Sequence, residues 1–257
     1  MMAVNTLKAK LDQGQSVIGI WSIIPSPIIA EIVGIAGLDF QILDMEHGVY
    51  DLPTIENSVR ASEAVGCSAL VRVAGSNLFS IQSCLDIGVS GIIVPQISNY
   101  ESALTSVKYM KYYPAGSRGF NPFTRGGNYG IASVENSKLN NDYGLASIII
   151  ENIEAYNQLD QILTIPDLDM VYLGVYDMSV ALGCKGDMNN PSLNEFVRTS
   201  VYKIQQMGKV AGLMVKSKDE IEMYLEMGAR FLVYGVDTFV IQSKMIDIVD
   251  EFKSVAI

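Results

Sequence analysis

The strongest constraint on the fold of this chain is a series of eight short runs rich in Val, Ile and Leu, spread over nearly its whole length. Most of the runs are separated by amphipathic segments with helical spacing, such as NEFVRTSVYKIQQMG. Continuous apolar strands that alternate with helices indicate parallel pairing, with both faces of the sheet buried. The runs cover residues 17–23, 39–45, 69–73, 91–97, 146–151, 169–174, 210–215 and 230–235.

Eight such units favour a closed (β/α)8 TIM barrel, an α/β fold, over an open doubly wound sheet. The G-x-G-x-x-G fingerprint that follows the first strand of a dinucleotide-binding sheet is absent from the sequence. With 257 residues and no Pro-, Gly- or Ser-rich linker, the chain is expected to form a single barrel domain over residues 1–257. The one long irregular stretch, residues 113–145, is rich in Gly, Asn and Arg, and a loop of that length is more often functional than idle.

The charge balance limits the possible partners. With 28 Asp and Glu against 18 Lys and Arg, the chain carries a net charge of −10. Nucleic acids and anionic membrane surfaces both require a basic patch, so neither is expected as a partner. Three cysteines at no metal-ligand spacing, Cys67, Cys84 and Cys184, predict neither a disulfide framework nor a Cys-rich zinc site. No apolar run approaches the roughly 18 residues of a membrane span, and the first residues lack a signal-peptide pattern, so we expect a cytoplasmic protein.

Polar side chains stand where several of the predicted strands end. In a (β/α)8 barrel, residues at the carboxyl ends of the strands build the active site. Those ends can therefore be searched for functional groups. The polar residues found there are Asp44, Glu46 and His47 after the second run, Arg72 in the third, Glu151 at the end of the fifth and Asp177 after the sixth.

His47 is the only histidine of the protein, and so the only imidazole that could act as a base near neutral pH. Asp44 lies close enough in sequence to orient the ring of His47 or to raise its basicity. The alternative role for His47 is that of a surface or capping residue.

Glu151 and Asp177 offer oxygen ligands with no Cys or second His nearby. Such ligands suit a hard, water-retaining cation, either Mg²⁺ or Mn²⁺, with Co²⁺ as an option in vitro. For each carboxylate alone, a helix cap or an ion pair is the alternative. Arg72 would be costly to bury without an anionic partner. That partner is either a protein carboxylate or the carboxylate or enolate of a substrate, which the planar guanidinium can bind through two hydrogen bonds.

Seven segments, taken in order, make the chain similar to a known family. They resemble the HpcH/HpaI aldolases, which are class II, metal-dependent pyruvate aldolases, and the resemblance covers nearly the whole chain. The segments are AEIVGIAGLDFQILDMEHG, ALVRV, LDIGVSGIIVPQI, YYPAGSRG, IIIENIEA, YLGVYDMSVALG and FLVYGVDTFVI.

The resemblance implies a barrel of the phosphoenolpyruvate/pyruvate-like kind and a role for each matching residue. The match to His47 is the catalytic base and the match to Asp44 supports it, while the match to Arg72 steadies the developing enolate. The matches to Glu151 and Asp177 hold the metal. The match to Asp86, in LDIG, also supports the histidine and approaches the site of a neighbouring subunit. The family further implies a homo-oligomer, a hexamer with a swapped terminal helix.

Three features depart from the family pattern. Ile149 stands where members usually have a glutamine that contacts the 2-oxo acid. The loop Gly174-Val175-Tyr176-Asp177 places the bulky Tyr176 where backbone amides are expected to contact the substrate carboxylate. The segment GFNPFTRGGNYG, residues 119–130, also differs, and we expect it to shape the aldehyde pocket. Ile149, Gly174, Tyr176, Asp177 and Arg72 are therefore the expected substrate-binding residues, and the identity of the 2-oxo acid stays open.

The sequence thus predicts an aldehyde-lyase that joins or cleaves pyruvate, or a related 2-oxo acid, and an aldehyde through a metal-stabilised enolate. Three alternatives remain. The first is a homologue that acts on a different nucleophile, either oxaloacetate or a coenzyme A ester. The coenzyme A ester would call for basic residues near the mouth to meet its phosphates, and Arg118 and Arg125 are the obvious candidates. A Schiff-base aldolase would need a lysine in the barrel, and the nearest one, Lys216, has the pattern of a solvated helix start. A non-catalytic protein that binds a sugar acid is the third alternative.

Overall fold

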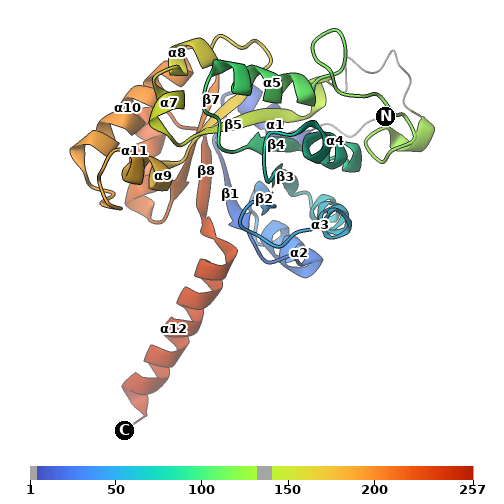
Figure 1. Cartoon of the computed structure of the whole chain (residues 1–257). Helices are drawn as coiled ribbons and strands as arrows, with labels where there is room; N and C mark the ends of the chain where they lie inside the picture. The colour runs from blue at the N-terminus through green and yellow to red at the C-terminus, as the bar shows by residue number, and fades with distance from the viewer. Residues whose placement is uncertain (1–4, 132–140, 257) are drawn as a thin grey trace.

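The computed structural model describes residues 5–131 and 141–256. Eight parallel strands pair in chain order and close into a barrel, with β1 hydrogen-bonded to both β2 and β8 (Figure 1). This confirms the predicted (β/α)8 barrel. The strands are β1 (Val17–Ser22), β2 (Phe40–Asp44), β3 (Ser68–Arg72), β4 (Gly91–Val94), β5 (Leu145–Ile150), β6 (Met170–Leu173), β7 (Val210–Val215) and β8 (Phe231–Val236).

Helices follow the strands and cover the outside of the barrel (Figure 1). Several begin at an Asn, Asp or Ser whose side chain accepts a backbone N–H of the first turn, as helix N-caps commonly do. The helices are α1 (Thr6–Asp12), α2 (Pro27–Ile35), α3 (Leu52–Ala64), α4 (Leu78–Ile87), α5 (Tyr100–Met110), the short η1 (Asn128–Gly130), α7 (Ile153–Tyr156), α8 (Leu159–Ile162), α9 (Val175–Ala181), α10 (Pro191–Gln206), α11 (Lys218–Met227) and α12 (Asp237–Val255).

The fourth strand is shorter than the apolar run that predicted it. The run extends to residue 97, but β4 ends at Val94. Pro95 has no N–H to donate to a neighbouring strand. Gln96 then adopts a left-handed backbone conformation with φ of 57°, which turns the chain out of the sheet and over the barrel mouth.

Alternate residues of each strand point into the barrel and fill it. Phe40 and Phe231 stack inside, with ring centroids 4.0 Å apart and planes inclined by 24°. Gly19 makes room for this pair, because a Cβ at that position would lie 2.4 Å from the Phe40 ring. Leu7 and Leu11 of α1 are buried against the same cluster and close the amino end. The interior is therefore a packed core, as in other barrels of this size.

The same alternation carries polar side chains to the carboxyl end. Phe40 and Ile42 point into the barrel, and the next residue of that row in β2 is Asp44. In the same way Arg72 follows Leu70, and Glu151 follows Ile149 just beyond β5. Because strand side chains repeat every two residues, the rows that build the core end in charged groups at the mouth.

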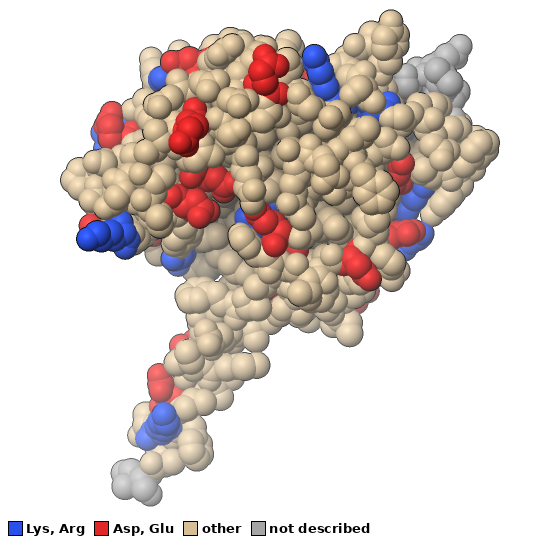
Figure 2. Space-filling model, viewed as in Figure 1, with Lys and Arg blue, Asp and Glu red and all other residues tan. Residues whose placement is uncertain are grey.

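Helix α12 leaves the body of the molecule, and the carboxyl terminus lies far from the barrel (Figure 1). Its visible surface is mostly uncharged, with a few charges toward its end (Figure 2). Large apolar side chains are exposed along it, including Met245, Ile246, Ile248, Val249 and Phe252, which is 67% exposed. Asp237 anchors the start of the helix, because its carboxylate accepts the backbone N–H groups of Ile23 and Ile24.

The long irregular stretch predicted at 113–145 is described up to residue 131 and from residue 141, and residues 132–140 lie outside the described part. Its described portion contains the turn η1 and an isolated bridge between Tyr112 and Arg118. Elsewhere, the three cysteines are free and buried. No helix in the described part of the chain is long and apolar enough to cross a membrane.

Candidate active site

A cavity of about 460 Å³ opens at the carboxyl end of the barrel. We call it the mouth cavity. Every site residue predicted from the sequence lines it except Asp86. Its lining includes Trp21, Asp44, His47, Arg72, Ile149, Glu151, Tyr172, Gly174, Tyr176, Asp177, Met214, Lys216, Val236 and Phe239. The structure thus brings together side chains from strands β1, β2, β3, β5, β6, β7 and β8 and from the segments that follow several of them.

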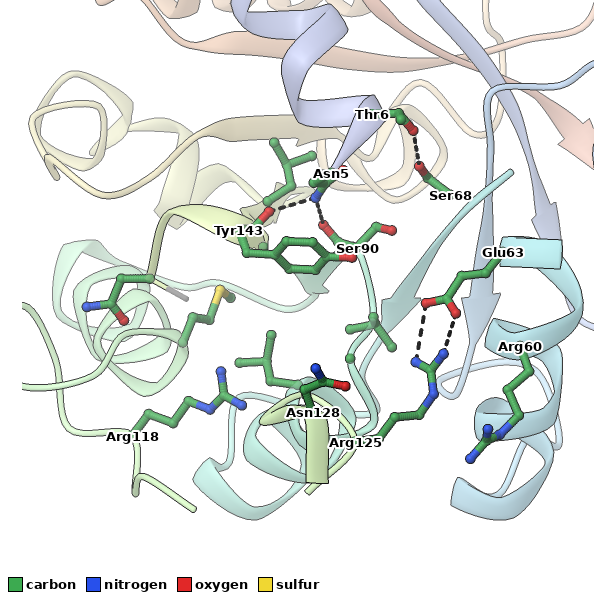
Figure 3. Close-up of a pocket in the computed structure, with 18 of the residues that line it drawn as sticks. Asn5, Thr6, Arg60, Glu63, Ser68, Ser90, Arg118, Arg125, Asn128 and Tyr143 are labelled. Atoms are coloured by element: carbon green, nitrogen blue, oxygen red, sulfur yellow. Dashed lines mark hydrogen bonds and ion pairs between the residues drawn. The ribbon is translucent and has the colours of Figure 1, made fainter. Parts of the chain in front are cut away.

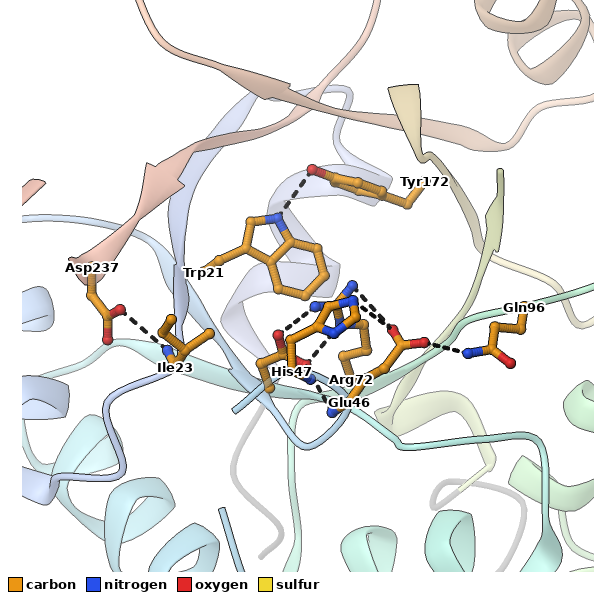
Figure 4. A network of polar contacts seen from close by, with 9 residues as sticks. Trp21, Ile23, Glu46, His47, Arg72, Gln96, Tyr172 and Asp237 are labelled. Carbon is orange, nitrogen blue, oxygen red and sulfur yellow. Dashed lines mark hydrogen bonds and ion pairs between the residues drawn. The ribbon is translucent and has the colours of Figure 1, made fainter. Parts of the chain in front are cut away.

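Arg72 is the centre of the polar network (Figure 4). Its Nε donates to Asp44 Oδ1 at 2.8 Å and its Nη2 to Asp44 Oδ2, while Nη1 lies 3.2 Å from Glu46 Oε2. The guanidinium also lies over the Trp21 ring, 4.4 Å from its centroid. Burial alone would lower the pKa of Arg72, but the hydrogen bond and charge of Asp44 and the charge of Glu46 raise it above its ordinary value. Arg72 therefore stays cationic. The anionic partner that its burial was expected to require is supplied by two protein carboxylates, Asp44 and Glu46.

The aromatic floor beneath Arg72 is fixed by a hydrogen bond. Trp21 Nε1 donates to the Tyr172 hydroxyl at 3.1 Å, and the two rings meet edge to face with centroids 5.5 Å apart. In Figure 4 the Trp21 ring lies between Tyr172 and the charged groups. Burial raises the pKa of Tyr172, and Arg72 and the Trp21 hydrogen bond offset only part of the rise, so the phenol stays neutral. The floor of the cavity is therefore aromatic, with the Trp21 N–H satisfied by the Tyr172 hydroxyl.

His47 lies at the rim. Its side chain is 69% exposed, and its Nε2 lies 3.9 Å from Glu46 Oε2. Asp44 accepts the backbone N–H of His47 at 3.3 Å and that of Glu46 at 2.9 Å. Within the described residues no hydrogen bond joins Asp44 to the imidazole. Asp44 thus shapes the turn that presents His47 and binds Arg72, but it does not hold the ring directly.

Gln96 links two carboxylates of the site. Its backbone N–H donates to Glu151 Oε1 at 2.6 Å, and its side-chain Nε2 donates to Glu46 Oε1 at 2.7 Å. The left-handed backbone of Gln96 directs the N–H toward Glu151, and a strained conformation of this kind is more common at functional sites. This role of Gln96 was not predicted from the sequence, although Gln96 lies in the VPQI segment and follows a proline at a strand end.

Glu151 and Asp177 have the chemistry of a divalent-metal site. Burial raises the pKa of Glu151; the hydrogen bond from Gln96 opposes this rise, and the nearby charges of Glu46 and Asp177 add to it. A bound cation would relieve the repulsion between the negative charge of Glu151 and those of Glu46 and Asp177. In residues 5–131 and 141–256, no group of three or more His, Cys, Asp or Glu side chains is placed to hold a metal. A cation on these two carboxylates would therefore take its other ligands from water and substrate oxygens, as Mg²⁺ and Mn²⁺ do.

Gly174 gives Glu151 the space it needs. A Cβ on residue 174 would lie 2.6 Å from the Cβ of Glu151 and 3.1 Å from its Oε2, and it would displace the carboxylate. Gly174 immediately precedes α9, whose first turn carries Tyr176 and Asp177. The glycine thus keeps space for the Glu151 carboxylate beside the start of α9.

The remaining predicted residue of this loop, Tyr176, is 41% exposed and meets a lysine. Lys216 Nζ lies 4.7 Å from the centroid of the Tyr176 ring. Lys216 was expected in a solvated helix start, but α11 begins only at Lys218, and Lys216 lines the mouth cavity directly after β7. None of the eight strands carries a lysine.

A second cavity, of about 580 Å³, lies at the other end of the barrel, beside the first residues of β3 and β5 (Figure 3). Arg118 lines it and its Nη2 donates to Asp86 at 2.7 Å. Arg125 lines it too, and it is paired with Glu63. Asp86 is thus engaged with Arg118 and does not line the mouth cavity of its own chain.

Within one chain, two expectations from the sequence are therefore wrong: the place of Arg118 and Arg125 near the mouth, and the place of residues 119–130 at the aldehyde pocket. Arg118 and Arg125 are not near the mouth, and both are already paired with carboxylates. Residues 119–130 follow α5, several of them line the cavity at the amino end, and none lines the mouth cavity. The physical reason is the order of the fold, because this segment follows α5 and precedes β5. In a (β/α)8 barrel a segment from a helix to the next strand lies at the amino end.

A closed α/β barrel with carboxylates, an arginine and a histidine gathered at its carboxyl end has the design of a barrel enzyme. The model of the HpcH/HpaI aldolase/citrate lyase family matches residues 17–243, and the chain belongs to that family. This confirms the resemblance that the sequence segments indicated.

Individual relatives agree with this assignment. The chain is 30% identical over 243 residues to 4-hydroxy-2-oxo-heptane-1,7-dioate aldolase of Escherichia coli, covering 91% of this chain and 89% of the relative. It is 28% identical over 252 residues to hydroxypyruvate/pyruvate aldolase of Pseudomonas aeruginosa, covering 98% and 94%. The crystal structure of an HpcH/HpaI aldolase from Desulfitobacterium hafniense superposes with a TM-score of 0.91 at 28% identity, over 97% of each chain.

Proposed function

We propose that the protein is a divalent-metal-dependent aldolase that makes or breaks the carbon–carbon bond of a 4-hydroxy-2-oxo acid. Its substrates are pyruvate, or a close 2-oxo acid, and an aldehyde. The observation that carries the proposal is the pairing of a two-carboxylate metal site, Glu151 and Asp177, with the cationic Arg72 in one cavity. The relatives named above act on substrates of this class.

The metal site is the electrophilic part of the proposed mechanism. When bound by Glu151 and Asp177, Mg²⁺ or Mn²⁺ supplies Lewis-acid polarisation of the 2-oxo acid. Gln96 contributes by holding the Glu151 carboxylate in place through its backbone N–H. Gly174 keeps the space beside Glu151 open.

In the cleavage direction, His47 takes the proton of the C4 hydroxyl. The C3–C4 bond then breaks, the aldehyde leaves, and the electron pair passes into the 2-oxo acid as its enolate. Arg72 offsets this negative charge, and the aromatic floor of Trp21 and Tyr172 limits the approach of water from below. The proton that His47 received then passes to C3, which restores neutral His47 and completes the reaction, and aldol addition runs through the same steps in reverse.

His47 is the exposed member of this set, and the chain alone leaves its ring unsupported by Asp44. We propose that Asp86 of a second copy supports it in a homo-oligomer, as the family resemblance implies. The apolar side chains exposed along α12 support assembly, because a monomer in water would leave them uncovered. The hexamer is the expected form.

A cleavage assay tests the proposed function. The purified protein is given a 4-hydroxy-2-oxo acid, and pyruvate is measured with Mg²⁺ or Mn²⁺, with EDTA, and in a Glu151→Gln variant. We expect pyruvate only with metal, and a loss of about 100-fold or more in the variant, since removing one of two carboxylate ligands costs at least as much as removing a supporting group. Asp219→Asn, an exposed carboxylate on α11, is the matched control and should retain activity.

The Schiff-base alternative has a separate test. Borohydride with pyruvate would trap a lysine adduct, which mass spectrometry locates. Activity that survives EDTA together with a trapped Lys216 would overturn the metal-dependent mechanism.

A further inference from the structure

Asp237 is a buried acid at the start of α12 that the proposed chemistry does not use. Among the described residues its carboxylate forms no ion pair. A carboxylate is costly to bury unless hydrogen bonds replace its water, and here it accepts the N–H groups of Ile23, Ile24 and Thr238 (Figure 4). Asp237 thus joins the start of α12 to the residues that follow β1.

Tyr50 holds the same residues from another element. Its hydroxyl donates to the carbonyl oxygen of Ile24 at 2.6 Å, while the N–H of Ile24 donates to Asp237 at 3.0 Å. Burial, together with the nearby charges of Asp237 and Asp44, raises the pKa of Tyr50, so the hydroxyl stays protonated and able to donate. Ile24 is thus held through both of its backbone polar groups.

The turn that carries His47 lies against this segment. Tyr50 follows His47 by three residues, and its bond to the segment closes the turn. Gly48 allows a close approach, because a Cβ on residue 48 would lie 3.3 Å from the Cα of Ile23. Ile23 and His47 both line the mouth cavity. A movement of the segment Ile23–Ile24 would therefore reach the proposed base.

We propose that Tyr50 and Asp237 are positioning residues for His47, which they hold in place through the segment Ile23–Ile24. Among the described residues the imidazole makes no hydrogen bond, so its place at the cavity depends on the backbone of its turn. The inference rests on the proposed aldolase function, in which His47 moves the proton. A displacement of about 1 Å at such a group can reduce a rate by about 100-fold, even when the substituted residue lies away from the chemistry.

Removal of a single hydroxyl tests the role of Tyr50. Tyr50→Phe keeps the buried ring and loses only the hydrogen bond to Ile24. Tyr234→Phe is the matched control, because the Tyr234 hydroxyl also donates to a backbone carbonyl, that of Lys216 at 3.0 Å, and Tyr234 does not line the mouth cavity. The readouts are kcat and KM for cleavage of a 4-hydroxy-2-oxo acid with Mg²⁺, and the affinity for Mn²⁺ in the absence of substrate.

We expect Tyr50→Phe to lower kcat by about 10-fold or more, with KM and the Mn²⁺ affinity nearly unchanged, because the metal and substrate contacts remain. Tyr234→Phe should retain nearly the full kcat. An unchanged kcat in Tyr50→Phe would overturn the proposal. So would an equal loss of kcat in the two variants, because a general loosening of the barrel mouth would then explain it.

The position of His47 can also be followed without metal or substrate. His47 is the only histidine, so protein labelled with ¹³C in its histidine rings gives one ring signal in NMR. At one pH, and at an unchanged molar mass in light scattering, the signal should shift or broaden in Tyr50→Phe and stay in place in Tyr234→Phe. An identical signal in Tyr50→Phe would overturn the proposal.

Substitutions of Asp237 test whether both residues act through one segment. An asparagine keeps one acceptor oxygen, so Asp237→Asn should lower kcat less than Asp237→Ala. When Asp237→Asn is combined with Tyr50→Phe, the loss should be smaller than the product of the two single losses, as for groups that hold one element. Losses that multiply would show that the two residues act independently, and would overturn the shared role.

The unsubstituted protein distinguishes failure of this inference from failure of the proposed function. Metal-dependent cleavage in that protein, with an equal kcat in Tyr50→Phe, leaves the aldolase standing and removes the positioning role. Absence of both cleavage and exchange of pyruvate methyl protons in D2O removes the aldolase and, with it, the role of Tyr50 and Asp237.

Discussion

Arg72 and Asp44 form a two-point hydrogen-bonded pair at the barrel mouth, in which Nε and Nη2 of the guanidinium each donate to one carboxylate oxygen. The pair joins the ends of β2 and β3, where the two residues are register partners. Asp44 is 1% exposed and also accepts two backbone N–H groups of the turn that carries His47. One buried carboxylate therefore sets both the charge at the mouth and the position of the proposed base.

This pair predicts that Asp44→Asn weakens both folding and activity. The substitution leaves the buried Arg72 charge without its main partner, and breaking a buried ion pair in this way costs about 3 kcal/mol. We expect that loss in urea unfolding, together with a fall in aldolase activity of about 100-fold or more. Asp51→Asn, at the exposed N-cap of α3, is the control and should change the stability by only about 0.5 kcal/mol or less without loss of activity, because Asn caps helices about as well as Asp. A stable, active Asp44→Asn protein would contradict the role of the pair.

The backbone of Gln96 predicts that two small substitutions differ in stability. Gln96→Gly and Gln96→Ala both remove the side-chain hydrogen bond to Glu46. Only glycine relieves the left-handed conformation, which costs a residue with a Cβ about 1–2 kcal/mol. The glycine variant should therefore be the more stable of the two by about 1 kcal/mol in chemical denaturation. Equal stability would show that the residue is not strained.

The buried thiols predict a steep pH dependence of labelling. Burial raises the pKa of Cys67 to about 12, with a further contribution from Asp39, and burial raises the pKa of Cys84 to about 12 as well. Since the thiolate is the reactive form, only about one molecule in 10,000 would carry it at pH 8. In a Cys184→Ser variant, labelling of the native protein by a disulfide reagent should be slow. It should rise about tenfold per pH unit between pH 8 and pH 10. Rapid labelling of the native protein at pH 7 would contradict the buried placement.

Helix α12 predicts assembly through its apolar side chains. Ile248 and Phe252 lie one turn apart on the helix and are 55% and 67% exposed. A double substitution to Glu should lower the molar mass seen in light scattering without unfolding the barrel. Asp247→Lys and Asp250→Lys, which change charge on the same helix, serve as the comparison and should leave the mass nearly unchanged. An unsubstituted protein that is monomeric at micromolar concentration would refute the expected oligomer.

Much of the fold could be predicted because it depends on a repeated local pattern. The eight apolar runs became the eight strands, and the side-chain alternation in β2, β3 and β5 placed Asp44, Arg72 and Glu151 at the mouth. These positions follow from strand geometry alone, since each polar residue ends a row of apolar ones. The grouping of Gly174, Tyr176 and Asp177 could be predicted in the same way, because they follow β6.

Other features of the site could be recognised only from the three-dimensional structure. Gln96 was missed because its contribution is a backbone N–H, which any residue possesses, directed by an unusual φ. Lys216 was placed in solvent because the helix that follows starts two residues later than expected. Arg118 and Arg125 were assigned to the wrong end, although their place between α5 and β5 would have predicted the amino end. The contact of Arg118 with Asp86 joins residues 32 positions apart and is not visible as a pattern.

The most direct test of the central claim is proton exchange at C3 of the 2-oxo acid without any aldehyde. Pyruvate and 2-oxobutyrate are incubated in D2O with the protein and Mg²⁺ or Mn²⁺, quenched with EDTA and followed by proton NMR, with His47→Ala as the comparison. The account predicts metal-dependent loss of the methyl signal of pyruvate, or of the C3 methylene signal of 2-oxobutyrate, and no such loss in the variant. A folded protein that exchanges neither substrate with any divalent metal would contradict it.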